Sequence, residues 1–289
     1  MYNFVILTDN TVDMPVEWLN EHEVGYECLP CSMNGVVYDK KNPIDTKLFY
    51  RQMREGAMPT TSQMNPAMAE AMFETYLQEG KDILYLAFSS GLSGTCNSAR
   101  IAAEELKEKY PERQIKIMDS LAASMGEGLL LYYAVKLRDK GKNLDEICDW
   151  LLENRLHLCH VFTVDDLNHL HRGGRVSKAT AVLGTLANIK PMLHVDNEGK
   201  LISIGKVRGR KKSLATLVSM MEERIGKYCD KNETVFVSHG DCEADAEYVA
   251  GLGKEKFGIE NIMIHPISAT IGAHSGPGTV ALFFLGEYR

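Results

Sequence analysis

Apolar runs of strand length alternate with longer, helix-like segments through most of the chain. The clearest unit joins the run at 82–88 (DILYLAF) to a predicted helix that ends near Tyr110 and to a second strand-like run at 114–118. A strand followed by a helix and another strand is typical of a parallel βαβ unit. The sequence therefore predicts an α/β fold whose first half contains a parallel sheet covered by helices.

The second half of the chain follows a different pattern. The turn Asp196-Asn197-Glu198-Gly199 separates strand-like runs at 191–195 and 200–207, which predicts an antiparallel hairpin. Further strand-like runs alternate with helical segments, so we expect a mixed sheet here. A chain of 289 residues has room for two domains. We predict an N-terminal parallel α/β/α domain at 1–157 and a C-terminal mixed-sheet α/β domain at 158–289.

Charge and hydropathy exclude several classes of protein. There are 32 Lys and Arg against 39 Asp and Glu, and the formal net charge of −7 argues against a nucleic-acid partner. The start, MYNFVILTDN, lacks the basic and apolar regions of a secretory signal. The longest uncharged stretch, 261–286, contains Pro, His and several Gly, so it does not suit a membrane-spanning helix. We expect a soluble, cytoplasmic protein.

The cysteines and histidines predict neither a disulfide framework nor a metal site. The seven cysteines are odd in number and scattered, and the single CxxC, Cys28 to Cys31, lies in a strand-like run without a second CxxC. Free thiols are therefore predicted. A second cluster fits no standard zinc spacing, so a structural role is favoured for it. Its members are His157, Cys159, His160, His169 and His171.

The strongest local signal is the heptapeptide SSGLSGT at 89–95, between the predicted strand and the long helix. Small residues at the carboxyl end of a strand leave backbone N–H groups free at a helix N-terminus, where anions bind. Simple capping by Ser93 or Thr95 is the alternative, but so many small polar residues exceed what a cap needs. The loop lacks the lysine of a phosphate loop, the GxGxxG fingerprint and the GxSxG spacing of a nucleophile elbow. A carboxylate suits such neutral donors.

Three other segments are candidates for the same site. Thr60-Thr61-Ser62 adds hydroxyl groups before a predicted helix, although capping alone would explain it. The basic turn at 172–175 (RGGR) could be a solvated surface turn, or its two Gly could let the backbone approach a ligand. His274 lies in a Gly-rich segment, 271–279, which we expect to be a loop before the last strand. Either a plain turn or an anion-binding His fits that segment.

Taken in order, these segments resemble the DegV family of fatty-acid-binding proteins, the carrier subunits of bacterial fatty acid kinase. The resemblance covers nearly the whole chain. It implies a fatty acid held between a parallel-sheet domain and a mixed-sheet domain, with an acyl tunnel to which the second domain contributes. The matching segments are TDNTVD at 8–13, TSQ at 61–63, SSGLSGT at 89–95, Asp119-Ser120, RGGR at 172–175 and HSGPG at 274–278.

The resemblance also implies roles for particular residues. Thr61, Ser62 and Ser93 correspond to carboxylate ligands, and Gly94 and Thr95 to backbone donors beside them. Arg172 and His274 correspond to positions that support phosphotransfer near the headgroup. Met64 stands where the family usually has Pro, which could shift the loop that carries Ser62.

The implied protein is a lipid carrier and not itself an enzyme. Its ligand would be a long-chain fatty acid such as palmitate, stearate or oleate, with no cofactor and no metal. Its partner would be the catalytic protein of a fatty acid kinase. Stable membrane insertion is not expected, while transient membrane contact is left open. The basic run at 206–212, with five cations in seven residues, is a second candidate for contact with the kinase.

Two other functions compete with this reading. A serine hydrolase would use Ser93 with His274 and an acid such as Asp9 or Asp119, although the second Gly of the elbow is misplaced. An enzyme of phosphorylated sugars or glycerol derivatives would hold phosphate in the loop at 89–95. No lysine or carboxylate cluster near that loop supports this third function.

Overall fold

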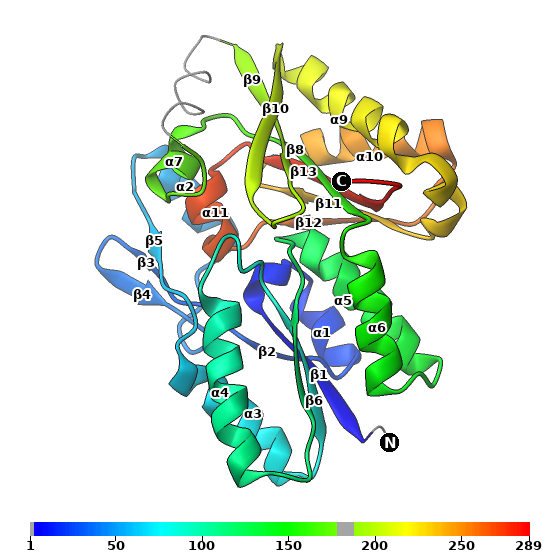
Figure 1. Cartoon of the computed structure of the whole chain (residues 1–289). Helices are drawn as coiled ribbons and strands as arrows, with labels where there is room; N and C mark the ends of the chain where they lie inside the picture. The colour runs from blue at the N-terminus through cyan, green and yellow to red at the C-terminus, as the bar shows by residue number, and fades with distance from the viewer. Residues whose placement is uncertain (1–2, 178–187) are drawn as a thin grey trace.

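The first sheet is parallel, as the alternation of strands and helices predicts. The structure is a computed structural model, which describes residues 3–177 and 188–289 (Figure 1). The order of this sheet is β2-β1-β6-β7, and each neighbouring pair is parallel. Its strands are β1 (Phe4–Asp9), β2 (Gly25–Glu27), β6 (Asp82–Ala87) and β7 (Ile115–Asp119).

Helices cover both faces of the first sheet because its central strands are apolar on both sides. In β6, Tyr85 packs toward α3 and α4, whereas its neighbours Leu84 and Leu86 pack toward α5. This alternation is the period of two that a strand imposes on its side chains. The helices are α1 (Val16–Glu21), α3 (Pro66–Gln78), α4 (Thr95–Lys109), α5 (Met125–Asp139) and α6 (Leu144–Asn154).

The second sheet is mixed, as predicted. Its order is β10-β9-β8-β13-β11-β12, and only the pair β11–β12 is parallel. The turn at 196–199 joins β9 to β10 in the predicted antiparallel hairpin. Helices α9 (Arg210–Ile225) and α10 (Glu243–Phe257) cover one face. The strands are β8 (Leu158–Thr163), β9 (Ile189–Val195), β10 (Leu201–Arg208), β11 (Val235–His239), β12 (Ile262–Pro266) and β13 (Val280–Leu285).

A small antiparallel sheet of order β4-β3-β5 was not predicted as a sheet. The hydroxyl-rich segment before α3 contains β5 (Thr60–Thr61), which pairs with β3 (Cys31–Met33). On its other side β3 pairs with β4 (Val36–Tyr38). Pairing with a strand distant in sequence orders these two threonines, and local composition cannot reveal that.

The prediction of a loop over 271–279 is wrong for its first half. Residues Ala269–Ser275 form the helix α11, which packs against α2 (Thr46–Arg54), α7 (Asn168–Arg172), β3 and β5. Gly272 is needed for this packing, because a Cβ at that position would lie 2.4 Å from Tyr50 Oη. The glycine therefore permits close contact between helices and does not mark a turn.

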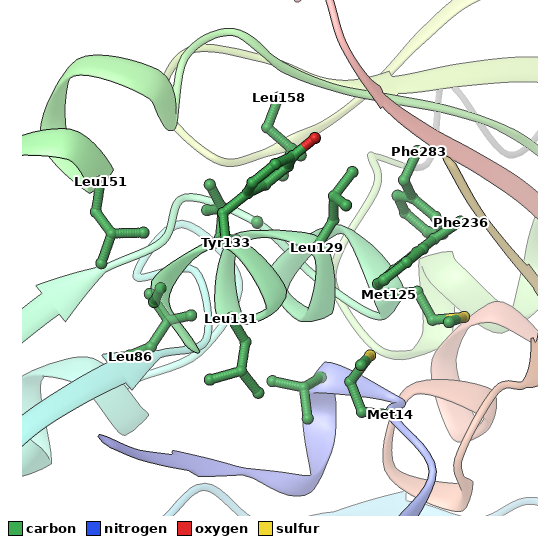
Figure 2. Close-up of a cluster of buried hydrophobic side chains, with 14 of the residues drawn as sticks. Met14, Leu86, Met125, Leu129, Leu131, Tyr133, Leu151, Leu158, Phe236 and Phe283 are labelled. Atoms are coloured by element: carbon green, nitrogen blue, oxygen red, sulfur yellow. The ribbon is translucent and has the colours of Figure 1, made fainter. Parts of the chain in front are cut away.

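Helix α5 connects the two large sheets through one continuous core (Figure 2). Leu131 lies toward Met14 and Leu86 of the first sheet's side, whereas Met125 lies toward Phe236 and Phe283 of the second sheet. No strand of either large sheet crosses residue 157. The division of the chain into domains at that residue stays a prediction.

Three further features bear on the class of protein. All seven cysteines are free thiols, as predicted, so Cys28 and Cys31 form no disulfide. Within residues 3–177 and 188–289, none of the helices has both the length and the apolar character needed to cross a membrane. Within the same ranges, no three His, Cys, Asp or Glu side chains are grouped as metal ligands would be.

Candidate functional site

The main cavity lies against the face of the second sheet that α9 and α10 leave uncovered. Its volume is about 450 Å³, which is within the usual range for small-molecule sites. Loops at the carboxyl edge of the first sheet, the start of α5 and the helix α11 enclose it from the other side. Most of its wall is apolar, and its apolar residues include Leu29, Phe88, Phe162, Leu201, Ile271 and Phe283.

A group of polar side chains gathers where α11 ends. Thr61 Oγ1, from β5, lies 2.7 Å from Nε2 of His274, the penultimate residue of α11. Burial, with a smaller contribution from the nearby Arg175, lowers the pKa of His274 to about 4. The imidazole is therefore neutral at pH 7, so one ring nitrogen can donate a hydrogen bond and the other can accept one.

The loop at 89–95 contributes Ser93 to the cavity wall. Its Oγ accepts a hydrogen bond from the backbone N–H of Thr95 at 3.2 Å and lies 3.0 Å from Thr95 Oγ1. Gly94 lies against the Gln63 side chain, since a Cβ there would lie 2.2 Å from Gln63 Oε1. Neither Gly94 nor Thr95 belongs to the described lining of the cavity. Gly94 contacts Gln63 of the other hydroxyl-bearing loop, and Thr95 hydrogen-bonds to Ser93.

Met64, which stands where the DegV family usually has Pro, makes a hydrogen bond that proline could not make. The backbone N–H of Met64 donates to Thr95 Oγ1 at 3.2 Å, and its side chain is fully buried. A proline, which lacks the N–H, could not make this hydrogen bond. Met64 therefore fastens the loop that carries Ser62 to the start of α4, and Ser62 lines the cavity beside Thr61.

The two arginines of the basic turn have different surroundings. Arg172 is exposed at the end of α7, and its Nη2 lies 2.6 Å from His169 Nδ1. Arg175 lines the cavity, and its Nε and Nη2 donate to the carbonyl oxygen of Leu92 at 3.2 and 3.1 Å. Gly173, the first of the two glycines between them, approaches α11 closely, because a Cβ at this position would lie 2.2 Å from His274 Nδ1.

The predicted site residues are thus brought together in part. Thr61, Ser62, Ser93 and His274 line the cavity, whereas Gly94, Thr95 and Arg172 lie outside its described lining. Gln63 and Arg175 also line it, and both belong to segments that the sequence had marked (TSQ and RGGR). Ser124 and Ser238 line it as well, and no sequence motif pointed to them.

The side chains required for the hydrolase alternative do not form a catalytic arrangement. In the described part of the chain no hydrogen bond joins Ser93 to His274, whose Nε2 instead contacts Thr61. Asp9 is occupied by Thr11 and Tyr85. Asp119 accepts from the backbone N–H groups of Ser90 and Leu121. A triad needs the nucleophile, base and acid in contact, so this geometry does not favour the alternative.

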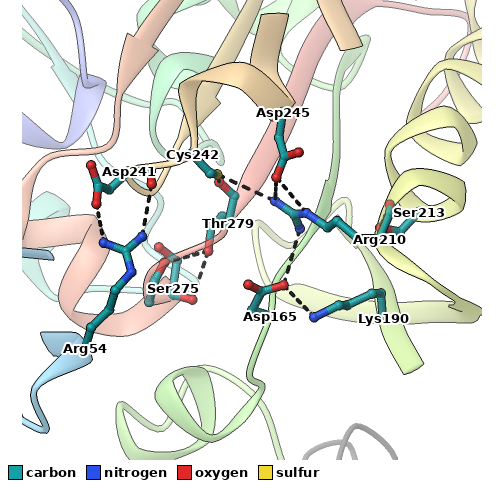
Figure 3. A network of polar contacts seen from close by, with 11 residues as sticks. Arg54, Asp165, Lys190, Arg210, Ser213, Asp241, Cys242, Asp245, Ser275 and Thr279 are labelled. Carbon is teal, nitrogen blue, oxygen red and sulfur yellow. Dashed lines mark hydrogen bonds and ion pairs between the residues drawn. The ribbon is translucent and has the colours of Figure 1, made fainter. Parts of the chain in front are cut away.

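One cation of the basic run at 206–212, Arg210, forms ion pairs within the protein. Figure 3 shows Arg210 bound to Asp245 and Asp165, with Lys190 on the same Asp165. Arg54 is similarly bound to Asp241, at the end of β11. Arg210 is therefore a poor candidate for recognition of a partner protein, which leaves the other cations of the run.

Asp13, behind the cavity, makes the stability of the fold depend on pH. Burial raises the pKa of this carboxyl from 3.8 to about 7. The folded state then holds a proton that the unfolded chain releases, so Asp13 costs stability as the pH rises through that window. We expect the unfolding midpoint of the wild type to fall relative to that of Asp13→Asn between pH 5 and pH 8. A difference that stays constant in thermal scans would contradict this assignment.

The fold and the cavity define an α/β protein with an apolar cavity of small-molecule size, polar where α11 ends. The model of the DegV family, described as "Uncharacterised protein, DegV family", matches residues 3–287, so the chain belongs to the DegV family. A DegV domain-containing protein of Clostridium perfringens is 46% identical, with 100% of this chain and 99% of the relative covered. One from Streptococcus pyogenes is 40% identical, with 98% of each covered.

Solved structures agree with this assignment. A DegV family protein from Thermus thermophilus, reported as fatty acid binding, is 29% identical and superposes with a TM-score of 0.84 over 98% of this chain and 99% of that one. DegV from Bacillus subtilis, also reported as a fatty acid binding protein, is 27% identical. It superposes with a TM-score of 0.84 over 99% of this chain and 100% of that one.

Proposed function

We propose that this protein binds one long-chain fatty acid in the cavity, with the carboxylate at Thr61, Ser62 and Ser93. The observation that supports the proposal is that these hydroxyl groups line one largely apolar cavity, in which Thr61 Oγ1 lies 2.7 Å from a neutral His274. Neutral donors suit a singly charged carboxylate that must give up its hydration. The fatty acids reported for the relatives from Thermus thermophilus and Bacillus subtilis support the same ligand class.

The apolar wall supplies most of the binding free energy in this proposal. An acyl chain of ~15 methylenes at ~0.8 kcal/mol each gives an upper bound near ~12 kcal/mol before ordering costs. The headgroup contacts then need only to orient the acid and to replace its lost water. Palmitate, stearate and oleate are the candidate ligands.

The second part of the proposal is presentation of the bound acid to a partner kinase. The exposed Arg172 lies one residue from Gly173, which touches His274. A kinase that reached the headgroup would therefore meet Arg172 on the surface nearby. The test is acyl phosphate formation with a purified fatty acid kinase, ATP and oleate, with and without this protein. Product that depends on this protein supports the role, and equal product without it contradicts the role.

The protein alone is expected to show no esterase activity, because among residues 3–177 and 188–289 no base hydrogen-bonds to Ser93. Hydrolysis of a p-nitrophenyl acyl ester should stay at the background rate of buffer. The matched control is Ser93→Ala, which should give the same background. Turnover by the wild type that disappears in Ser93→Ala would favour the hydrolase instead.

A further inference from the structure

A second polar place lies in the cavity wall, away from the proposed headgroup position. Ser124 Oγ, at the start of α5, donates to Asp13 Oδ2 at 2.5 Å and lies 3.0 Å from Ser238 Oγ of β11. Both serines line the cavity. Both are at least nine-tenths buried, with exposed fractions of 5% for Ser124 and 0% for Ser238.

This place has unused hydrogen-bonding capacity. A hydroxyl offers one proton and two lone pairs, and Ser238 Oγ makes a single hydrogen bond among the described residues, to Ser124. His160 lies beside the same turn, since its Nε2 is 3.5 Å from the backbone N of Ala123. It also lines the cavity and is only 2% exposed.

The surroundings of this place are apolar. On the sheet, Ala281 of the middle strand β13 lies between Ser238 of β11 and Phe162 of β8. Phe283, also of β13, pairs with His160 of β8. A plain hydrocarbon chain laid across this wall would cover Ser238 without offering it a partner. Buried polar groups left in this state disfavour binding of a ligand that lacks the matching group.

The position along the ligand follows from α11, which lies between Asp13, the partner of Ser124, and Thr61 of the proposed headgroup position. Near its start, the backbone N–H of Ser268 donates to Asp13, and near its end His274 contacts Thr61. Six helical residues rise by about 9 Å. With the carboxylate held at Thr61, the second place therefore meets the middle of an acyl chain.

We propose that Ser238, with Ser124, binds a neutral hydroxyl group carried in the middle of the acyl chain, so that hydroxylated long-chain fatty acids are preferred ligands. This inference rests on the proposed fatty acid site. A hydroxyl can both donate and accept, which suits the serine pair, since Ser238 Oγ keeps unused hydrogen-bonding capacity. A second carboxylate does not suit the place, because burial there opposes a charge, as the raised pKa of the neighbouring Asp13 carboxyl indicates.

The test is a competition titration of delipidated protein carrying a fluorescent fatty acid. The competitors are octadecanoic acid and its 2-hydroxy, 10-hydroxy and 12-hydroxy derivatives. At least one mid-chain hydroxy acid should bind about tenfold more tightly than octadecanoic acid, and the 2-hydroxy acid should show no such gain. In Ser238→Ala this affinity ratio should fall toward one. In Ser275→Ala, which removes another buried serine hydroxyl from the cavity wall, the ratio should persist.

The outcomes separate this inference from the function on which it rests. If no fatty acid displaces the probe, the proposed function itself is wrong. If the acids bind but octadecanoic acid equals or exceeds every mid-chain hydroxy acid, only the inference fails. A preference that survives in a folded Ser238→Ala protein also overturns it. Should Ser238→Ala not fold, the ranking of ligands by the wild type alone decides.

Discussion

Replacing Ser93 with Ala is expected to weaken fatty acid binding by about 1–3 kcal/mol, or about 5-fold to 150-fold in Kd. Ser93 lines the cavity together with Thr61 and Ser62, so its loss would leave the carboxylate of the proposed ligand short of one donor. Titration with a fluorescent fatty acid measures the change. An unchanged Kd would remove Ser93 from the site.

The same loop offers a matched control for this substitution. Ser90 is exposed and lies outside the described lining of the cavity, so Ser90→Ala should leave the affinity unaltered. Ser93 Oγ also accepts a hydrogen bond from the N–H of Thr95. The unfolding midpoint of Ser93→Ala should therefore be measured alongside, so that a loss of binding is compared between folded proteins.

Replacing Arg172 with Ala is expected to reduce kinase-dependent acyl phosphate formation sharply, by tenfold or more, while the affinity for fatty acid stays within about threefold. Loss of a charged contact across a protein interface costs about this much. Arg172 is exposed and lies outside the cavity lining that the structure describes, so it has no direct contact through which to hold the carboxylate. The assay is acyl phosphate formation with purified kinase, run beside a direct fatty acid titration.

Two further variants test whether Arg172 serves contact with the kinase and does not hold the fatty acid. Arg175→Ala removes a cation that lines the cavity and holds the carbonyl of Leu92, so it should weaken both binding and phosphorylation. Lys140→Ala removes an exposed cation at the end of α5 and should change neither. If Arg172→Ala instead loses binding and phosphorylation in equal proportion, Arg172 holds the ligand and the division is wrong.

The parts of the fold that local sequence determines were predictable. The strand at 82–88, the loop after it and the helix α4 follow from a buried apolar run, small polar residues and helix periodicity. The hairpin at 196–199 follows from its turn residues. In each case the deciding interactions lie within a few residues of one another.

The parts that depend on contacts between distant segments were not predictable in the same way. The helix α11 was expected to be a loop because its glycines resemble turn residues. Gly272 instead leaves room for Tyr50, a residue more than two hundred positions earlier in the chain. Arg172 and Arg175 are equivalent in sequence, and only the packing of α7 places the second one in the cavity wall. Ser124 and Ser238 meet through tertiary structure alone.

The most direct test of the central claim is native mass spectrometry of the protein purified from cells without added lipid. The account predicts a bound mass equal to that of one long-chain fatty acid, plain or hydroxylated, which is lost on delipidation and restored by one equivalent of oleate. A bound mass that matches a phosphorylated sugar, or a delipidated protein that takes up no fatty acid, would contradict it.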